Sequence, residues 1–219
     1  MILHLQRVID TDTITAVREK LGQQTFTDGK LTAGWAAKSL KNNQQLEKTK
    51  AADAIIDLLL KRLRASPGVE SALRPKHVAR AMINRYSKNE HYGMHMDDAL
   101  MAGIRTDISF TLGLTSLNDY AGGALTIDDS SGQRSWRLDA GDLLIYPSYF
   151  LHQVEPVVEG ERLAMVGWVQ SLVRDAQQRE ILFDLHTAVK TEHQVNGHSE
   201  QFFRLTKSYQ NLLRRWIES

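Results

Sequence analysis

The sequence predicts an α+β protein with a mainly β core, namely a jelly roll with flanking N-terminal helices and a C-terminal helical hairpin. Apolar side chains recur at helical spacing in the first third of the chain and again after residue 175. Between these parts, short apolar segments are separated by turn signals about every eight to twelve residues, which is typical of a sandwich or a jelly roll. We therefore expect a helical support region at 1–77, a β domain at 78–172 and a helical extension at 173–219.

Composition limits the possible classes of function. The chain has 219 residues, of which 42% are hydrophobic, and this suits one large domain with appendages. Its net charge of +1 gives no electrostatic reason to expect a nucleic-acid partner. The absence of cysteine excludes disulfides, thiolate catalysis and cysteine-based zinc sites. We find neither a signal peptide nor an apolar segment long enough for a membrane, so we expect a cytoplasmic protein.

The N-terminal region is predicted to begin with a strand at 2–9. Asp10 can cap the helix that follows, and Gly22 can end it. A stronger helix is predicted at 47–65, because its apolar residues form a wide stripe that suits core packing. Pro67-Gly68 is expected to stop this helix.

The segment between these two helices, 26–46, is rich in Gly, Thr, Lys and Asn and is predicted to be a long loop. It contains Trp35 and several amides. Such a loop could border a substrate site, or it could be a solvated connector, and the sequence leaves both readings open.

The β domain is predicted to consist of short strands. In 107–114, apolar side chains alternate with Ser109 and Thr111, as expected along a strand. The other predicted strands are 78–86, 124–127, 136–138, 143–146, 151–158 and 162–169, with turns at 118–123 and 128–132.

The last part of the chain returns to helical spacing. A helix is predicted at 175–191, Asn196-Gly197 should break it, and Ser199 can cap a final helix. Two helices with a short connection form an antiparallel hairpin. These terminal helices could join copies of the chain into a homo-oligomer.

Three residues of the β domain suggest a metal site. His95 and Asp97 are two residues apart, so in an extended segment their side chains point to the same side. His152, at the start of a later predicted strand, adds a second imidazole. Two imidazoles and one carboxylate, with the other positions of the ion open, are the ligands of non-haem Fe(II) oxygenases. His91 is not expected to be a ligand, because Gly93 disrupts any helix that would align it with His95, and we place it in a loop.

A longer series of residues gives these three a specific context. It resembles the prolyl 4-hydroxylase-like group of Fe(II)/2-oxoglutarate dioxygenases over roughly 78–172. The series is Tyr86, Gly93, His95-Met96-Asp97, Gly122-Gly123-Ala124-Leu125, Gly141 to Pro147, His152 to Val157, Gly160-Glu161-Arg162 and Trp168. With Thr32-Ala33-Gly34, Lys41-Asn42-Asn43-Gln44 and the helical tail, nearly the whole chain looks like the bacterial PKHD-type hydroxylases.

The resemblance implies a double-stranded β-helix in which His95, Asp97 and His152 bind Fe(II). It also implies that Arg162 pairs with the distal carboxylate of 2-oxoglutarate, for which a planar guanidinium is well suited. Tyr86 is a second candidate for that carboxylate. Many relatives carry a serine two residues after the arginine, where this chain has Ala164, so the second hydrogen bond must come from elsewhere, and Tyr86 is the first candidate.

The implied reaction is hydroxylation of a small-molecule or peptidyl substrate by O2, while 2-oxoglutarate is converted to succinate and CO2. Asp97 favours hydroxylation, because halogenating relatives lack this carboxylate. L-ascorbate is implied as a reductant for oxidised iron. The alternatives are a non-catalytic jelly-roll protein that senses iron or 2-oxoglutarate, and a structural module that assembles through its terminal helices. The resemblance does not identify the substrate.

The two functional segments also carry a geometric expectation. We expect His152 and Arg162 on adjacent antiparallel strands that reverse near 158–161. Both side chains can face one pocket only if the reversal has an odd number of loop residues or a bulge. Gly160 should therefore have a positive φ.

Overall fold

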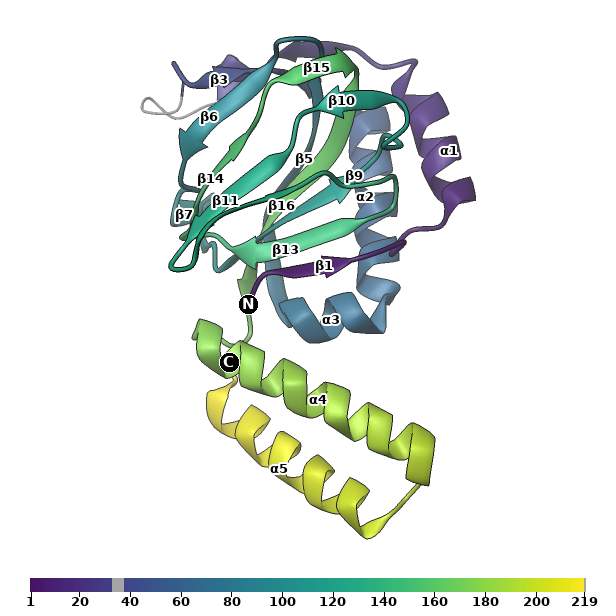
Figure 1. Ribbon diagram of the computed structural model, residues 1–219, viewed down its shortest axis with the longest axis vertical. Helices are drawn as coiled ribbons and strands as arrows, with labels where there is room; N and C mark the ends of the chain where they lie inside the picture. Colours follow the sequence, from purple (N-terminus) through teal and green to yellow (C-terminus); the bar gives the residue numbers. More distant parts are fainter. Residues whose placement is uncertain (33–37, 219) are drawn as a thin grey trace.

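The computed structural model describes residues 1–32 and 38–218. Two antiparallel sheets face each other in a jelly roll, and a helical hairpin projects from one end of it (Figure 1). In the described residues, the larger sheet consists, from edge to edge, of β1 (Leu3–Leu5), β13 (Leu143–Pro147), β9 (Ile108–Gly113), β16 (Arg162–Ser171), β5 (Pro75–Tyr86), β4 (Gln44–Leu46) and β2 (Phe26–Asp28). The mainly β jelly-roll core predicted from the sequence is confirmed.

The smaller sheet supplies the opposite wall of the jelly roll. Its strands, from edge to edge, are β12 (Gly132–Trp136), β11 (Leu125–Asp129), β14 (Leu151–Val154), β6 (His91–His95) and β3 (Lys41–Asn42). Two short pairs complete the β structure, β10 (Tyr120–Gly122) with β15 (Val157–Gly160), and β7 (Leu100–Met101) with β8 (Ile104–Arg105).

The N-terminal helices cover the outer face of the larger sheet. They are α1 (Thr11–Leu21), α2 (Lys50–Ala65) and α3 (Pro67–Leu73), with a 3-10 turn η1 at Gly29–Thr32. Asp10 caps α1 by accepting a 2.7 Å hydrogen bond from the Thr13 amide, as its sequence position predicts. The apolar stripes of α1 and α2 pack on the outward side chains of β5, β9 and β16, where Ile83, Leu112 and Met165 are fully buried. This packing leaves the opposite face of the sheet to form the interior of the jelly roll.

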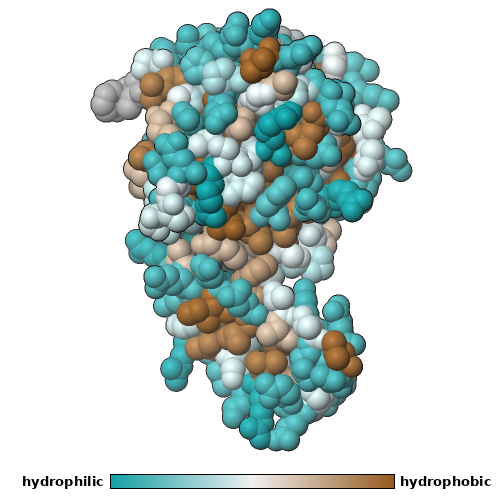
Figure 2. All heavy atoms as spheres, in the orientation of Figure 1, coloured by the Kyte–Doolittle hydropathy of each residue, from teal (hydrophilic) through white to brown (hydrophobic). Residues whose placement is uncertain are grey.

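The C-terminal hairpin is formed by α4 (Ala176–Asn196) and α5 (Glu200–Trp216), which lie side by side below the jelly roll (Figure 1). It has a small core around Val173, Leu182 and Tyr209. Figure 2 shows apolar side chains at the surface of the hairpin. Phe203 and Val195 are among the exposed apolar residues of its two helices. Assembly through this hairpin stays a prediction. No helix of the described residues is long and apolar enough to span a membrane.

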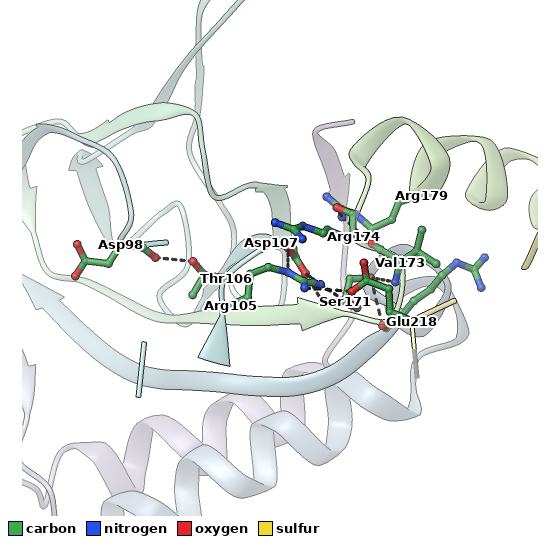
Figure 3. Close-up of polar contacts among 10 residues, drawn as sticks. Asp98, Arg105, Thr106, Asp107, Ser171, Val173, Arg174, Arg179 and Glu218 are labelled. Atoms are coloured by element: carbon green, nitrogen blue, oxygen red, sulfur yellow. Dashed lines mark hydrogen bonds and ion pairs between the residues drawn. The ribbon is translucent and has the colours of Figure 1, made fainter. Parts of the chain in front are cut away.

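A partly buried group of ion pairs ties the end of the chain to the jelly roll (Figure 3). Arg105 donates from Nε and Nη2 to the two oxygens of Asp107, at 2.7 and 3.1 Å, and from Nη1 to Glu218 at 3.1 Å. Asp107 also accepts a 2.9 Å hydrogen bond from the Ser171 amide. Thr106, which lies between Arg105 and Asp107 in the sequence, donates through its hydroxyl to the carbonyl oxygen of Asp98. The C-terminal segment is therefore linked to the loop that follows Asp97.

Several boundaries differ from the prediction. The 26–46 segment is not one long loop, because β2 and β4 extend the larger sheet and β3 extends the smaller one. These strands have two or three residues, too few to show a periodicity. Trp35 and the Ala33-Gly34 part of the motif lie outside the described residues. Pro67 does not merely stop a helix but starts α3, because proline suits the first turn of a helix.

The segment predicted as one strand at 151–158 is two strands. Pro156 has no amide hydrogen for a ladder, and β14 ends before it. The chain then leaves the smaller sheet, and β15 pairs with β10. Elsewhere, the strand predicted at 136–138 is wrong, because β12 comes earlier in the chain and ends at Trp136. His91 lies in β6 rather than in a loop.

The expected pairing of the strands that carry His152 and Arg162 is wrong. β14 pairs with β11 and β6, whereas β16 pairs with β5 and β9, so the two residues lie in opposite sheets. Gly160 does have a positive φ, +74°, as predicted. A second reason for glycine is a close backbone approach, since a Cβ at this position would lie 2.0 Å from the carbonyl oxygen of Asp119, just before β10.

Replacing Arg105 with methionine should lower the free energy of unfolding by about 1.5–3 kcal/mol, because Asp107 would stay buried without its charged donor. Urea unfolding of the full chain measures this. Arg204→Met is the matched control, since Arg204 pairs with Glu200 on the exposed surface of α5 and contributes little. Equal stabilities of the two variants would contradict the structural importance of the Arg105–Asp107 pair.

Candidate active site

A cavity of about 370 Å³ lies inside the jelly roll, between the two sheets. Side chains alternate along a strand, so every second residue of β5 and β16 faces this cavity. These residues are Arg80, Met82, Asn84 and Tyr86 on β5, and Arg162, Val166 and Trp168 on β16. The strands pair Arg162 with Tyr86 at one end and Trp168 with Arg80 at the other. The cavity therefore has an end near Arg162 and a mouth near Trp168.

His95, Asp97 and His152 meet on the wall of this cavity. Their candidate ligand atoms all lie within 4.8 Å of one another. His95 and His152 are cross-strand partners of β6 and β14, with ring centroids 4.3 Å apart. Nε2 of His152 lies 3.7 Å from Oδ2 of Asp97. The three side chains could hold one divalent cation between them.

Both imidazoles are oriented by the backbone. Nδ1 of His95 lies 2.8 Å from the Gly93 carbonyl oxygen, and Nδ1 of His152 lies 3.0 Å from that of Phe150. A carbonyl only accepts, so each Nδ1 carries the hydrogen and each Nε2 presents a lone pair. Burial, followed by the neighbouring His152, lowers the pKa of His95 to about 3. His95 is therefore neutral at physiological pH, as a metal ligand must be.

Neighbouring side chains fix the other parts of this cluster. The ring of Tyr92 stacks on His95 at a centroid distance of 3.6 Å, and the ring of Tyr146 lies edge-on to His152 at 5.1 Å. The Ser109 hydroxyl donates a 2.5 Å hydrogen bond to Oδ2 of Asp97. This bond holds the carboxylate in place, and it reaches the same oxygen that faces Nε2 of His152.

The inner end of the cavity carries an unpaired positive charge. Arg162 is only 4% exposed, yet within the described residues it has no hydrogen-bond acceptor and no ion-pair partner. Its guanidinium carbon lies 5.3 Å from the centroid of the Tyr86 ring. Burial raises the pKa of Tyr86, which remains a hydroxyl donor. A buried guanidinium without an anion costs free energy, so this end suits an anionic ligand.

The mouth of the cavity is different in character. Four of the six methionines of the chain line the cavity, Met82, Met94, Met96 and Met101, together with Leu40 and Trp168, and Met96 is exposed. Apart from Asp97 and Arg162, the charged groups of the lining are Lys41, Arg80 and Asp98, of which Arg80 and Asp98 are exposed. Methionine side chains adapt to irregular shapes, so this mouth suits an organic molecule with an apolar part.

The structure brings all five residues singled out from the sequence, namely Tyr86, His95, Asp97, His152 and Arg162, to this one cavity. His91 does not join them, and its Nδ1 lies 3.2 Å from the carbonyl oxygen of Asn89. The sequence analysis assigned no role to Lys41, Tyr92, Ser109 or Tyr146. Lys41 and Tyr146 stand within the quoted motifs, and Ser109 is a polar residue within an otherwise apolar strand, so these three had a visible signal.

The similarity to known proteins agrees with this geometry. Residues 81–170 match the 2OG-Fe(II) oxygenase superfamily, and residues 175–218 match the PKHD-type hydroxylase C-terminal domain. A PKHD-type hydroxylase of Idiomarina loihiensis is 56% identical over 218 residues, covering 100% of both chains. The chain belongs to the PKHD-type hydroxylases. It is therefore an oxygenase, with a 2OG-Fe(II) oxygenase domain followed by a PKHD C-terminal domain.

Solved structures share the fold of this hydroxylase. A Burkholderia pseudomallei oxidoreductase of the 2OG-Fe(II) oxygenase family has a TM-score of 0.57 at 18% identity, over 76% of this chain and 84% of that one. HygX from Streptomyces hygroscopicus, with nickel and 2-oxoglutarate bound, has a TM-score of 0.59 at 12% identity, over 78% and 82% of the two chains. At these identities the similarity establishes the jelly-roll fold.

Lowering the pH from about 6.5 to about 3 should destabilise the metal-free hydroxylase through His95. The unfolded chain has an ordinary histidine pKa near 6.5 and binds a proton that the native state excludes, so the free energy of unfolding falls with pH. Urea unfolding in a chelator, at a series of pH values, measures this. The His95→Gln variant should show a weaker dependence, and an unchanged dependence would refute the assignment to His95.

Proposed function

We propose that this hydroxylase binds Fe(II) through Nε2 of His95, Nε2 of His152 and the carboxylate of Asp97. Two neutral nitrogens and one carboxylate on the same side of an octahedral ion leave three positions for other ligands. The fixed tautomers, the neutral His95 and the hydrogen bond from Ser109 to Asp97 all support this assignment. Fe(II), when bound, would supply the oxidative chemistry.

We further propose that Arg162 and Tyr86 bind the distal carboxylate of 2-oxoglutarate. The observation that carries this proposal is the buried, unpaired guanidinium of Arg162 in the same cavity as the candidate metal ligands. Its planar fork matches a carboxylate, and Tyr86 is its cross-strand partner. Tyr86 can therefore provide the hydrogen bond that Ala164 cannot.

The overall reaction would insert one oxygen atom of O2 into a C–H bond of the substrate and the other into succinate, with release of CO2. The chain would position both organic molecules and exclude water, which are its main contributions to such a reaction. The substrate, a small molecule or a peptidyl group, would enter through the methionine-lined mouth. L-ascorbate would restore Fe(II) after unproductive turnovers.

Reconstitution with Fe(II) under anaerobic conditions, followed by addition of 2-oxoglutarate and O2, should yield succinate. His95→Ala, Asp97→Ala and His152→Ala should each abolish stoichiometric Fe(II) binding and succinate formation, because each removes one of three ligands. His91→Ala is the matched control and should retain both. Stoichiometric binding of Fe(II) and 2-oxoglutarate without succinate formation would indicate a sensor instead of a hydroxylase. Equal loss of iron in His91→Ala and His95→Ala would refute the ligand assignment.

Arg162→Lys should weaken 2-oxoglutarate binding by about 10- to 150-fold while Fe(II) binding persists. Lysine keeps the charge but loses the two parallel donors, and a hydrogen bond to a charged group contributes about 1.5–3 kcal/mol. Calorimetric titration of the Mn(II)-loaded protein with 2-oxoglutarate measures the affinity. Arg85→Lys, on the same sheet but outside the cavity, is the control. An unchanged affinity in Arg162→Lys would remove Arg162 from the co-substrate site.

A further inference from the structure

Lys41 is a second buried cation in the cavity, and neither the metal ligands nor the co-substrate site explains it. It lies on β3, opposite Tyr92 of β6, and is only 5% exposed. Within the described residues it has no carboxylate partner, and residues 33–37, which precede it, include no acidic residue. Its Nζ lies 5.3 Å from the centroid of the Tyr92 ring. A buried ammonium group without an anion is costly.

The neighbourhood of Lys41 increases this cost. Burial and then the positive charge of Arg80 lower the pKa of Lys41 to about 8, and the attraction of Asp28 is a smaller effect. Arg80 also lines the cavity, and within the described part of the chain it too has neither an ion pair nor a hydrogen bond from its side chain. Two cations that line the same cavity, and that have no anionic partner among the described residues, favour a shared anion.

The other charges of the cavity do not neutralise this pair. Arg162 belongs to the proposed co-substrate site and Asp97 to the proposed metal site. Asp98 is the remaining acid of the lining, and it is exposed. With Fe(II) and 2-oxoglutarate bound, the mouth would therefore keep a positive pair beside an apolar wall of methionines and Trp168.

We infer that Lys41 and Arg80 select a substrate that carries an anionic oxygen group, a carboxylate or a phosphate, attached to an apolar body. The anionic group binds between the two cations, and the body lies on Met82, Met94 and Trp168. This inference rests on the proposed function, since it assigns 2-oxoglutarate to Arg162. Tyr92 connects the two sites, because it faces Lys41 across the strands and stacks on His95.

Three probes with the same eight-carbon chain test the inference, namely octanoate, octyl phosphate and the neutral octanamide. Each is titrated calorimetrically into the full-length protein loaded with Mn(II), which supports no turnover, and with saturating 2-oxoglutarate, which occupies Arg162. The wild-type protein should bind at least one anion about 10-fold or more tightly than the amide. Lys41→Met and Arg80→Gln should each reduce this preference by about 10-fold.

Lys76→Met is the matched control, because Lys76 lies on the same strand as Arg80 but outside the cavity, and it should keep the wild-type preference. The ratio of anion to amide affinity is the readout, so a general weakening of the site does not imitate the expected result. Arg80 is exposed, so Arg80→Gln tests the inference even if Lys41→Met fails to fold. Failure of the wild-type protein to bind either anion, equal binding of anions and amide, or an unchanged preference in Arg80→Gln would overturn the inference.

The same titrations separate this inference from the proposed function. A protein that prefers the anions through Lys41 and Arg80 but forms no succinate would support the anion site and contradict the proposed reaction. A protein that forms succinate but binds the amide as tightly as the anions would support the reaction and contradict the anion site.

Discussion

The rest of this structure depends on one constraint, namely that two sheets face each other across a single interior. The smaller sheet contributes His95 and His152 as cross-strand partners, and the larger sheet contributes Arg162 and Tyr86 as cross-strand partners. Neither sheet alone holds both pairs. The N-terminal helices support this arrangement indirectly, because they bury the outer face of the larger sheet and thereby direct its polar side chains inward. Helix packing outside the jelly roll thus determines which residues line the cavity.

The interior is electrostatically unbalanced in a way that stability alone does not explain. Arg162 and Lys41 are both almost fully buried, and within the described residues neither has an anionic partner. Each costs free energy in the unliganded protein, and an anion bound beside it would offset that cost. The two buried cations therefore lie where a bound anion would stabilise the fold. A ligand that binds only the folded state raises the free energy of unfolding.

Local features of this fold could be predicted from the sequence, whereas strand partners could not. Asp10 and Ser199 cap their helices as predicted, since a cap depends on neighbouring residues. The alternation around Ser109 identified β9, but it gave no information on which strands flank it. Pairing His152 with Arg162 across a simple reversal failed for this reason, because Pro156 ends β14 and the chain crosses to another sheet. The three proposed metal ligands could be selected without correct pairing, since their residue types and order carry the signal. The role proposed for Lys41 could not be predicted, because it rests on burial and on the lack of a partner among the described residues.

The pairing of β5 with β16 explains how one cavity can serve two different ligands. Their inward residues run from Arg162 and Tyr86 at the inner end to Trp168 and Arg80 at the mouth. Six residues of strand separate Arg162 from Trp168, a distance of roughly 20 Å at about 3.3 Å per residue. That length accommodates a five-carbon diacid with a second organic molecule beyond it. A shift of one residue in this register would turn one of the two rows out of the cavity. The proposed co-substrate end and the mouth therefore depend on the same backbone hydrogen bonds between these two strands. A change of substrate preference is expected to come from the side chains at the mouth rather than from a shift of the strands.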